Sequence, residues 1–452
     1  MRARSARWWL VAVLLTAACA PGSDTTTTDG SAATNTPPVT ATPPPTTGGQ
    51  GDEPLDTEWW LPAAIEQPDV VATIRPDRLW LFGVVPTADG VLLVQADDNG
   101  NGFVSSWADG AERWRTTVDG TPSVAVLGDE VVVGTNRAGA GGPATDLVVL
   151  ALDDGAELRR SSVDGSYGLS NIGGEVLALD RSDEGTTIAW FDPEAARPVP
   201  LATLDLDNLV PTRDGLLAWS RSETVLLRHG ETWTVARWAV GGDGQGPSNL
   251  RTATVVGDLL VRVDGGRRAA FDAAGRQVVE LPLTIDPSQV WSIDGEHVAV
   301  AGDGGVEVLT VAGGTATVVL TERRDGAPRG GAVVDGTLLL SWYDGASGTV
   351  LAVTPDGVTE LVAFAAPPAD GGDELPDAVT FTTDGCYLET ATGDTEHGST
   401  LTLAAYAVDG TRHWSVDLTL DPGDGGQWRF GDGVAVLIHG YVLIPWRIDV
   451  YG

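Results

Sequence analysis

The sequence predicts an all-β fold, and three observations lead to that prediction. First, 58 glycines and 27 prolines are spread along the 452 residues, and many of the glycines stand in Asp-Gly, Gly-Asp or Gly-Gly pairs. Such pairs favour tight turns, because glycine adopts positive φ and aspartate hydrogen-bonds its own turn. Second, short runs of Val, Leu and Ala lie between these turns, as expected for short strands. Third, no segment shows the sustained 3.6-residue period of an amphipathic helix.

An internal repeat organises the chain beyond residue 53. A hairpin of the type "SVAVLGDEVVVGT" occurs nine times, and its turn glycines are 38 to 49 residues apart. These glycines are Gly90, Gly128, Gly173, Gly215, Gly257, Gly295, Gly336, Gly385 and Gly433. A second hairpin, such as "LVVLALDDGAELRR", lies between consecutive copies of the first. Each repeat thus supplies four short strands in roughly 40–50 residues, which is the size of one propeller blade.

The repeat predicts a single β-propeller domain of four-stranded antiparallel blades over residues 53–452. One such sheet alone is marginal, but blades stacked around an axis cover each other's faces. Eight complete repeats and a partial ninth predict eight blades, with seven as the alternative because terminal repeats are often irregular. The final run "VAVLIHGYVLIPWRIDV" is expected to close the ring with strands from residues near Trp59 to Leu81.

Residues 1–18 have the pattern of a secretory signal peptide. A basic start precedes an apolar run of 11 residues, Trp8 to Ala18, whereas a membrane-spanning helix needs ~20. The segment Thr16-Ala17-Ala18-Cys19 resembles a bacterial lipobox, which predicts lipidation of Cys19. An ordinary signal peptide that happens to contain a cysteine is the alternative.

Residues 19–52 are predicted to form a disordered tether. This Thr/Pro-rich segment has almost no large apolar side chain with which to build a core. A lipid, a semi-stiff tether and a globular body together predict a lipoprotein on the outer, extracellular face of the cytoplasmic membrane. A linker without a tethering role is the alternative.

The composition excludes several functions. The formal net charge is −36, which repels nucleic acid and anionic lipid headgroups, so the membrane is expected to be contacted only through the lipid. All 27 positive charges are arginines, which excludes lysine Schiff-base chemistry and a lysine-containing phosphate loop. The one further cysteine, Cys386, has no internal disulfide partner if Cys19 is lipidated, and is expected to be a buried thiol.

The second hairpin resembles the repeat of the pyrroloquinoline-quinone-like β-propellers. The segments "LVVLALDDGAELRR" and "LAAYAVDGTRHWSVDL" resemble its apolar–Tyr–Ala–Leu–Asp run, followed by a small turn with glycine. Trp114 and Trp414 stand at its tryptophan position. The resemblance implies a propeller of the quinoprotein type, a family that includes quinone-dependent dehydrogenases and non-catalytic lipoprotein scaffolds. The dehydrogenases' vicinal Cys-Cys pair is missing, which favours the scaffolds, and the all-Arg composition resembles that of actinobacterial proteins.

The segment "DDNGNG" offers a candidate calcium loop. Asp97, Asn99 and Asn101 have EF-hand-like spacing, and the carbonyl of Phe103 would complete the ligands. However, acids are missing at the ninth and twelfth positions of the loop, where Ser105 and Ala108 stand. A polar turn between strands explains the segment without a metal, and no cofactor is predicted.

No catalytic set can be assigned from the sequence. The five histidines lack metal-ligand spacing, and neither a Gly-x-Ser-x-Gly elbow nor a His-Glu-x-x-His motif is present. The predicted function is therefore a monomeric, non-catalytic scaffold that binds a cell-envelope protein or glycan. A quinone-dependent sugar or alcohol oxidoreductase is the alternative.

Three long Gly/Pro-rich connections are candidates for a binding rim: Asn136–Asp146, Gly241–Asn249 and Ala366–Asp377. The first falls inside a repeat and the other two fall between repeats, which suggests opposite faces of the ring. The two between repeats are expected to share one rim, whose acids favour a cationic partner.

Overall fold

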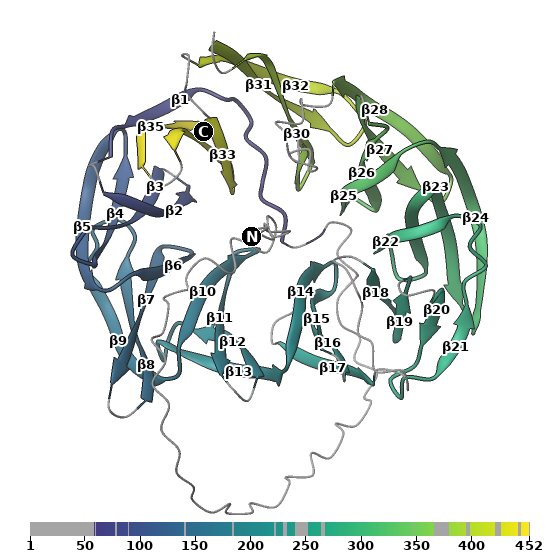
Figure 1. Cartoon of the computed structure of the whole chain (residues 1–452), viewed down its shortest axis with the longest axis horizontal. Helices are drawn as coiled ribbons and strands as arrows, with labels where there is room; N and C mark the ends of the chain where they lie inside the picture. The colour runs from purple at the N-terminus through teal and green to yellow at the C-terminus, as the bar shows by residue number, and fades with distance from the viewer. Residues whose placement is uncertain are drawn as a thin grey trace, which may run out of the picture.

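The computed structural model is a closed ring of nine small antiparallel sheets around a central axis (Figure 1). It describes residues 58, 60–76, 79–88, 90–139, 142–182, 185–220, 223–228, 233–239, 252–263, 267–345, 347–365, 379–394, 398–420, 426–441 and 444–451. The predictions for the signal peptide, Cys19 and the tether lie outside these residues. Within them the chain forms only strands, turns and irregular segments, and no helix is present that could cross a membrane.

Consecutive strands in the chain are neighbours in each sheet, and the first strand of each blade is nearest the axis (Figure 1). The first three blades are β2 (Trp80–Thr87), β3 (Gly90–Ala96), β4 (Asn101–Ala108) and β5 (Ala111–Asp119); β6 (Pro122–Leu127), β7 (Glu130–Gly139), β8 (Gly142–Ala151) and β9 (Glu157–Asp164); and β10 (Tyr167–Ile172), β11 (Glu175–Ser182), β12 (Gly185–Asp192) and β13 (Arg197–Leu204). The next three are β14 (Leu206–Thr212), β15 (Gly215–Ser220), β16 (Glu223–Arg228) and β17 (Thr234–Ala239); β18 (Ala253–Val256), β19 (Leu259–Arg262), β20 (Ala269–Phe271) and β21 (Gln277–Glu280); and β22 (Asp286–Ser292), β23 (His297–Ala312) and β24 (Thr315–Arg324). The last three are β25 (Ala327–Val334), β26 (Thr337–Tyr343), β27 (Ser347–Thr354) and β28 (Gly357–Ala365); β29 (Val379–Thr382), β30 (Gly385–Asp394), β31 (Gly398–Ala407) and β32 (Arg412–Leu420); and β33 (Gly426–Gly431), β34 (Val434–Tyr441) and β35 (Ile444–Tyr451) with β1 (Val70–Ile74).

The all-β class and the four-stranded blades are confirmed, but the predicted count of eight or seven blades is wrong. The partial last repeat is a ninth blade, because β1 adds its outermost strand in the order β33, β34, β35, β1. Thr73 pairs with Asp449 and Ile74 with Ile448, so both ends of the chain meet in one sheet. The N-terminal region does close the ring as expected, but only through β1, since Trp80 already begins the next blade.

The blade of β22 to β24 has three strands because β23 is long and bends sharply. Its first half pairs with β22 and its second half, from Gly304, pairs with β24. Gly304 and Gly305 have φ of 94° and 135°, which only glycine adopts without strain. The amide of Val311 donates to the carbonyl of Glu296 (2.8 Å), so the two halves of β23 lie side by side. This blade is therefore equivalent to the four-stranded blades.

The core lies between adjacent blades, as the alternation of side chains along the inner strands requires. On β26, Leu338 and Leu340 pack against the blade before, while Leu339 packs on the other face. All three are fully buried, and each contributes on the order of 2 kcal/mol of transfer free energy. Cys386 is 1% exposed on β30, and burial raises its pKa to about 12, so the predicted buried thiol is confirmed.

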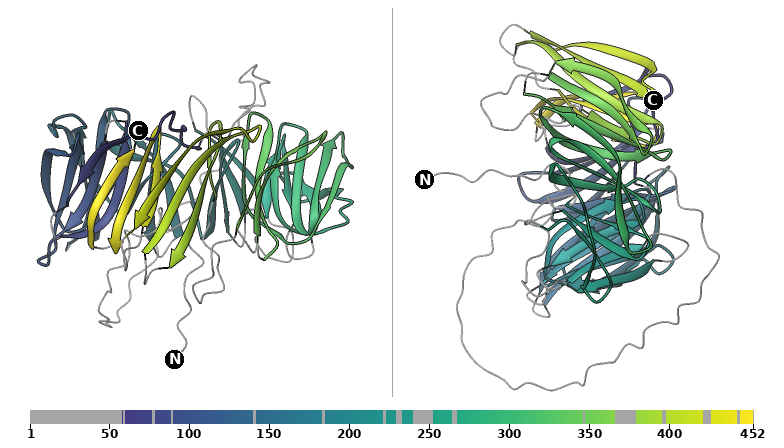
Figure 2. Two further views of the ribbon diagram at one scale, coloured as in Figure 1. Left: turned by 90° about the horizontal axis from the view of Figure 1, so that it is seen from above. Right: turned by 90° about the vertical axis from the view of Figure 1, so that its right-hand side faces the viewer.

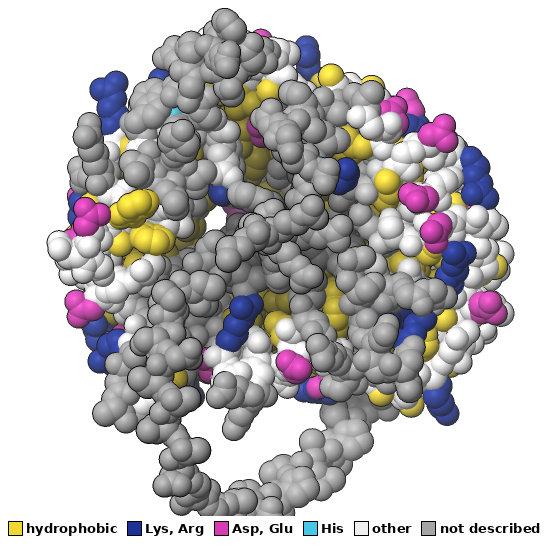
Figure 3. All heavy atoms as spheres, in the orientation of Figure 1, with side chains coloured by type: hydrophobic (Ala, Val, Ile, Leu, Met, Phe, Trp, Pro, Cys, Tyr) yellow, Lys and Arg dark blue, Asp and Glu magenta, His cyan; other side chains and the backbone are white. Residues whose placement is uncertain are grey.

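The ring has two faces that the strand order distinguishes. One face carries the turns between the first and second strands of each blade, such as Thr383–Asp384, and we call it the closure face. The loop face carries the turns between second and third strands and the connections between blades, and Figures 1 and 3 look onto it.

Residues 60–69 together with Glu58 form an N-terminal strap on the closure face. The purple chain in Figure 1 runs from near the axis past β30 and β33 to β1, and Figure 2 shows it on the side that carries the C-terminus. The strap accepts hydrogen bonds at Pro62 O from Thr383 N (3.0 Å) and at Ala63 O from Gly433 N (3.1 Å). Glu58 N donates to Val333 O (2.9 Å). The strap thus bonds to strand β25 and to the first turns of two further blades before it enters β1.

Candidate binding face

The loop face is the face on which the strands that flank the predicted rim connections end and begin. Gly241–Asn249 and Ala366–Asp377 lie outside the described residues, but the strands that flank them end and begin on this face. The turn between β7 and β8 opens on the same face, because strands alternate in direction around the ring. The expectation that Asn136–Asp146 faces the opposite side is therefore wrong.

The predicted calcium loop forms the turn between β3 and β4 on the loop face. Asp97 Oδ1 accepts hydrogen bonds from the amides of Asn99 (2.9 Å) and Asn101 (2.8 Å), and Oδ2 accepts one from Asn101 Nδ2 (2.8 Å). Gly100 closes the turn with φ of 83°, and its amide donates to Asp97 O (3.1 Å). These hydrogen bonds, above all the one from the Asn101 side chain, lower the pKa of Asp97. The carboxylate therefore stays ionised and organises its own turn.

The structure brings Asp97, Asn99 and Asn101 together and places Phe103 in β4, where it pairs with Gln95. The amide nitrogens of both asparagines point at the Asp97 carboxylate. To ligate calcium, the asparagines would have to turn their oxygens toward the ion, because calcium takes oxygen ligands. The calcium site stays a prediction, and the polar-turn interpretation accounts for every hydrogen bond described here.

Two aromatic side chains of β2 are exposed beside this turn. Leu81 points inward and is 2% exposed, while Trp80 and Phe82 on either side of it are 42% and 45% exposed. The indole N–H of Trp80 donates to Asp98 Oδ1 (3.0 Å), which joins the ring to the acidic turn. Hydrophobic side chains are visible over the first strands of this blade in Figure 3. We call Trp80, Phe82 and the turn Asp97–Asn101 the aromatic platform.

A β-bulge positions Phe82. The register shifts between Leu81 and Gly83, so Phe82 has no cross-strand partner. Bulges re-aim side chains at sheet edges and next to functional sites. Three other inner strands have bulges at the corresponding position, where Asp207, Ser288 and Arg329 stand in place of Phe82. Among these four bulges only that of β2 carries an aromatic residue.

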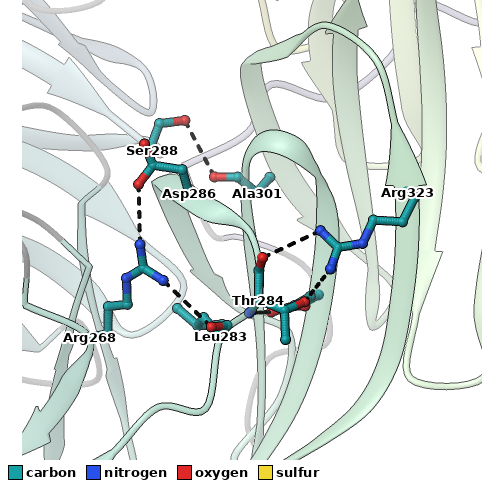
Figure 4. A network of polar contacts seen from close by, with 8 residues as sticks. Arg268, Leu283, Thr284, Asp286, Ser288, Ala301 and Arg323 are labelled. Carbon is teal, nitrogen blue, oxygen red and sulfur yellow. Dashed lines mark hydrogen bonds and ion pairs between the residues drawn. The ribbon is translucent and has the colours of Figure 1, made fainter.

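Polar contacts hold another connection on the loop face, the one between β21 and β22 (Figure 4). Arg268 donates to Leu283 O (3.5 Å) and pairs with Asp286 (3.2 Å). Thr284 N donates to Oε2 of the fully buried Glu307 (2.9 Å), and Arg323 donates to Thr284 O (3.4 Å). Figure 4 shows Arg268 and Arg323 approaching the connection from opposite sides. The connection is thus fixed by charged side chains from two blades.

The described residues contain no group of three or more His, Cys, Asp or Glu side chains arranged to hold a metal ion. His439 is instead paired with Asp449 (2.9 Å) inside the closing blade. His297 is paired with Asp294 (2.7 Å) at the turn between β22 and β23.

No family model and no curated protein matches the sequence. Solved structures with a similar arrangement include Sqt1 from Chaetomium thermophilum (TM-score 0.43, 11% identity, covering 85% of this chain and 99% of that one). They also include BamB from Moraxella catarrhalis (TM-score 0.30, 15% identity, 85% and 99%). A third is the dihydro-heme d1 dehydrogenase NirN (TM-score 0.38, 14% identity, 80% and 78%). At these identities the similarity concerns the fold alone.

Proposed function

We propose that this chain is a lipid-anchored propeller of the cell surface that binds a protein or glycan of the cell envelope on its loop face, without catalysing a reaction. The observation that carries the proposal is the aromatic platform. Trp80 and Phe82 expose apolar rings on a protein whose other large exposed hydrophobics are all aliphatic among the described residues. Exposed tryptophan contributes strongly to binding interfaces, because one ring offers a large apolar area at a low entropic cost.

The platform also carries negative charge. Asp98 holds the Trp80 indole, and the ionised Asp97 lies next to it in the chain. A cation can interact with an exposed ring face and with a carboxylate at the same time. The chain as a whole has a formal net charge of −36, which attracts a cationic partner over longer distances. A basic protein segment or an amino-sugar glycan fits this chemistry.

The double change Trp80→Ala and Phe82→Ser is expected to reduce capture of the partner at least tenfold. The tagged, full-length protein is incubated with solubilised cell envelope, and bound proteins and glycans are quantified by mass spectrometry at low and high salt. Leu158→Ser is the matched control, because Leu158 is 46% exposed on the outermost strand β9, away from the platform. Equal capture by wild type, double variant and control contradicts the proposal. Insensitivity to salt contradicts its electrostatic part.

Cys19→Ser is expected to release the protein from the membrane. The thiol of Cys19 is the proposed attachment point for acyl chains, and stable anchoring needs two or more lipid signals. Fractionation of cells and labelling with a fatty-acid analogue check the result, with Cys386→Ser as the control for the second cysteine. Unchanged membrane retention of Cys19→Ser rules out this anchor.

A further inference from the structure

A cavity of about 230 Å³ lies on the closure face between the N-terminal strap and the blade of β29 to β32. One wall is the strap segment Ala64–Glu66, and the others come from residues of β29 to β32 and their turns. An apolar cavity of ~150 Å³ accepts benzene, whereas drug-sized ligands need at least ~300 Å³. The volume therefore suits a molecule of roughly four to eight non-hydrogen atoms.

The charges around the cavity select for a cation. Its lining includes the carboxylates of Glu66 and Asp384 and the rings of Tyr387 and Tyr406; among the described residues that line it, His413 is the one basic side chain and there is no arginine. Carboxylates and tyrosine rings together are the groups that bind organic ammonium ions. The thiol of Cys386 also lines the cavity, and burial raises its pKa to about 12, so it adds no negative charge.

The Tyr387 hydroxyl independently indicates that the ligand carries a hydrogen-bond acceptor. Tyr387 is 2% exposed, and its oxygen accepts a hydrogen bond from the strap amide of Ile65 (2.6 Å). Its own proton has no acceptor among the residues that the structure describes. Burial raises the pKa of Tyr387 to about 12, so the hydroxyl keeps this proton at neutral pH. Since an unmade hydrogen bond in a buried place is costly, a ligand oxygen is favoured there.

We propose that this cavity binds a small amino alcohol. Its ammonium group lies beside the carboxylates of Asp384 and Glu66, and its oxygen accepts the hydrogen bond of Tyr387. Such a ligand would contact the strap and the blade of β29 to β32 together. The strap is already tied to this blade, because Trp414 Nε1 donates to Ile65 O (2.8 Å). Bound ligand is therefore expected to stabilise the strap in its place.

The test uses the full-length protein and three probes in calorimetric titrations and thermal unfolding. Choline and ethanolamine carry the charge and the oxygen, while 3,3-dimethyl-1-butanol has the shape of choline without its charge. At least one amine is expected to bind and to raise the unfolding temperature, and the neutral alcohol is expected to bind at least tenfold more weakly. Vesicles of phosphatidylcholine or phosphatidylethanolamine, compared with phosphatidylglycerol, show whether a lipid headgroup can supply the same chemistry.

Asp384→Asn is the decisive variant, because it removes the charge and keeps an oxygen that can accept from Thr382 Oγ1 (3.1 Å in the wild type). It is expected to weaken amine binding at least tenfold, and Tyr387→Phe is expected to weaken it as well. Asp258→Asn, at the exposed turn between β18 and β19 of another blade, is the matched control and should bind as the wild type does. The proposal is overturned if neither free nor vesicle-borne amines bind, if the neutral alcohol binds equally well, or if Asp384→Asn leaves the affinity unchanged. None of these outcomes depends on the aromatic platform.

Discussion

Replacement of Asp449 by alanine is expected to lower the free energy of unfolding by about 3 kcal/mol at pH 7, because it breaks a buried charge cluster in the closing blade. Asp449 is 1% exposed on β35. Its carboxylate accepts hydrogen bonds from Thr73 Oγ1 (2.7 Å) and Arg447 Nε (2.8 Å) and lies 2.9 Å from His439 Nε2. Thr73 belongs to β1, so this cluster joins the N-terminal strand to the two C-terminal ones.

The effect of Asp449 should depend on pH with a definite sign. Burial by itself would raise the pKa of Asp449, but the hydrogen bonds from His439, Arg447 and Thr73 outweigh burial and lower the pKa below its usual value. A carboxyl group with a depressed pKa in the folded state adds stability above its unfolded pKa of ~3.9, and this contribution is lost as the pH falls through the folded value. The difference between wild type and Asp449→Asn should therefore be largest near pH 7 and shrink below about pH 4.

Urea unfolding followed by tryptophan fluorescence between pH 3 and 8 measures both effects. Asp258→Ala is the control, because the side chain of Asp258 is fully exposed at the turn between β18 and β19, and such a change is expected to stay within about 0.5 kcal/mol. A loss for Asp449→Ala no larger than the control's would mean that the cluster does not hold the ring closed.

The blades could be predicted from the sequence because the information for each is local. A hairpin with a glycine turn and alternating apolar residues specifies its own pairing, as "SVAVLGDEVVVGT" does for β6 and β7. The sequence does not predict the ninth blade, because the pairing of its two outer strands has no such local signal. Its strands β35 and β1 come from opposite ends of the chain, and β1 is only the short run Val70–Ile74.

The candidate sites were harder to predict, for physical reasons that differ between them. The aromatic platform had a local signal, since Trp80, Leu81 and Phe82 alternate between exposed and buried positions. However, only the β-bulge at Phe82 and the hydrogen bond from Trp80 to Asp98 show which of these three side chains face solvent. The closure-face cavity has no local signal. Ile65 and Tyr387, which meet at its wall, are 322 residues apart in the chain.

The change Glu389→Gln is expected to stabilise the protein at pH 8. Glu389 lies on β30, where it pairs with Leu403, and its side chain is largely buried. No hydrogen bond or ion pair to its carboxylate occurs among the described residues. Burial alone raises its pKa from 4.5 to about 7, because the low-dielectric surroundings disfavour the charged form. Removal of the ionisable group should therefore remove a cost of folding.

The sign of this effect is opposite to that of Asp449. Below about pH 4.5 Glu389 is protonated in both the folded and the unfolded protein, so the substitution should change little there. Between pH 4.5 and 7 the unfolded chain releases its proton while the folded chain keeps it, so the wild type loses stability as the pH rises. Above pH 7 the cost is constant and amounts to at most about 3 kcal/mol, at 1.36 kcal/mol for each pH unit between the two pKa values.

Urea unfolding of wild type and Glu389→Gln at pH 4, 6 and 8 checks this prediction. The variant should match the wild type at pH 4 and exceed it progressively at pH 6 and 8. Glu280→Gln on the outer strand β21 is the control, because Glu280 is exposed and its replacement should have no comparable effect at any of these pH values. Destabilisation of Glu389→Gln at pH 8 would show that the charged carboxylate has a stabilising partner, since a buried ion gains from staying charged only when it is paired.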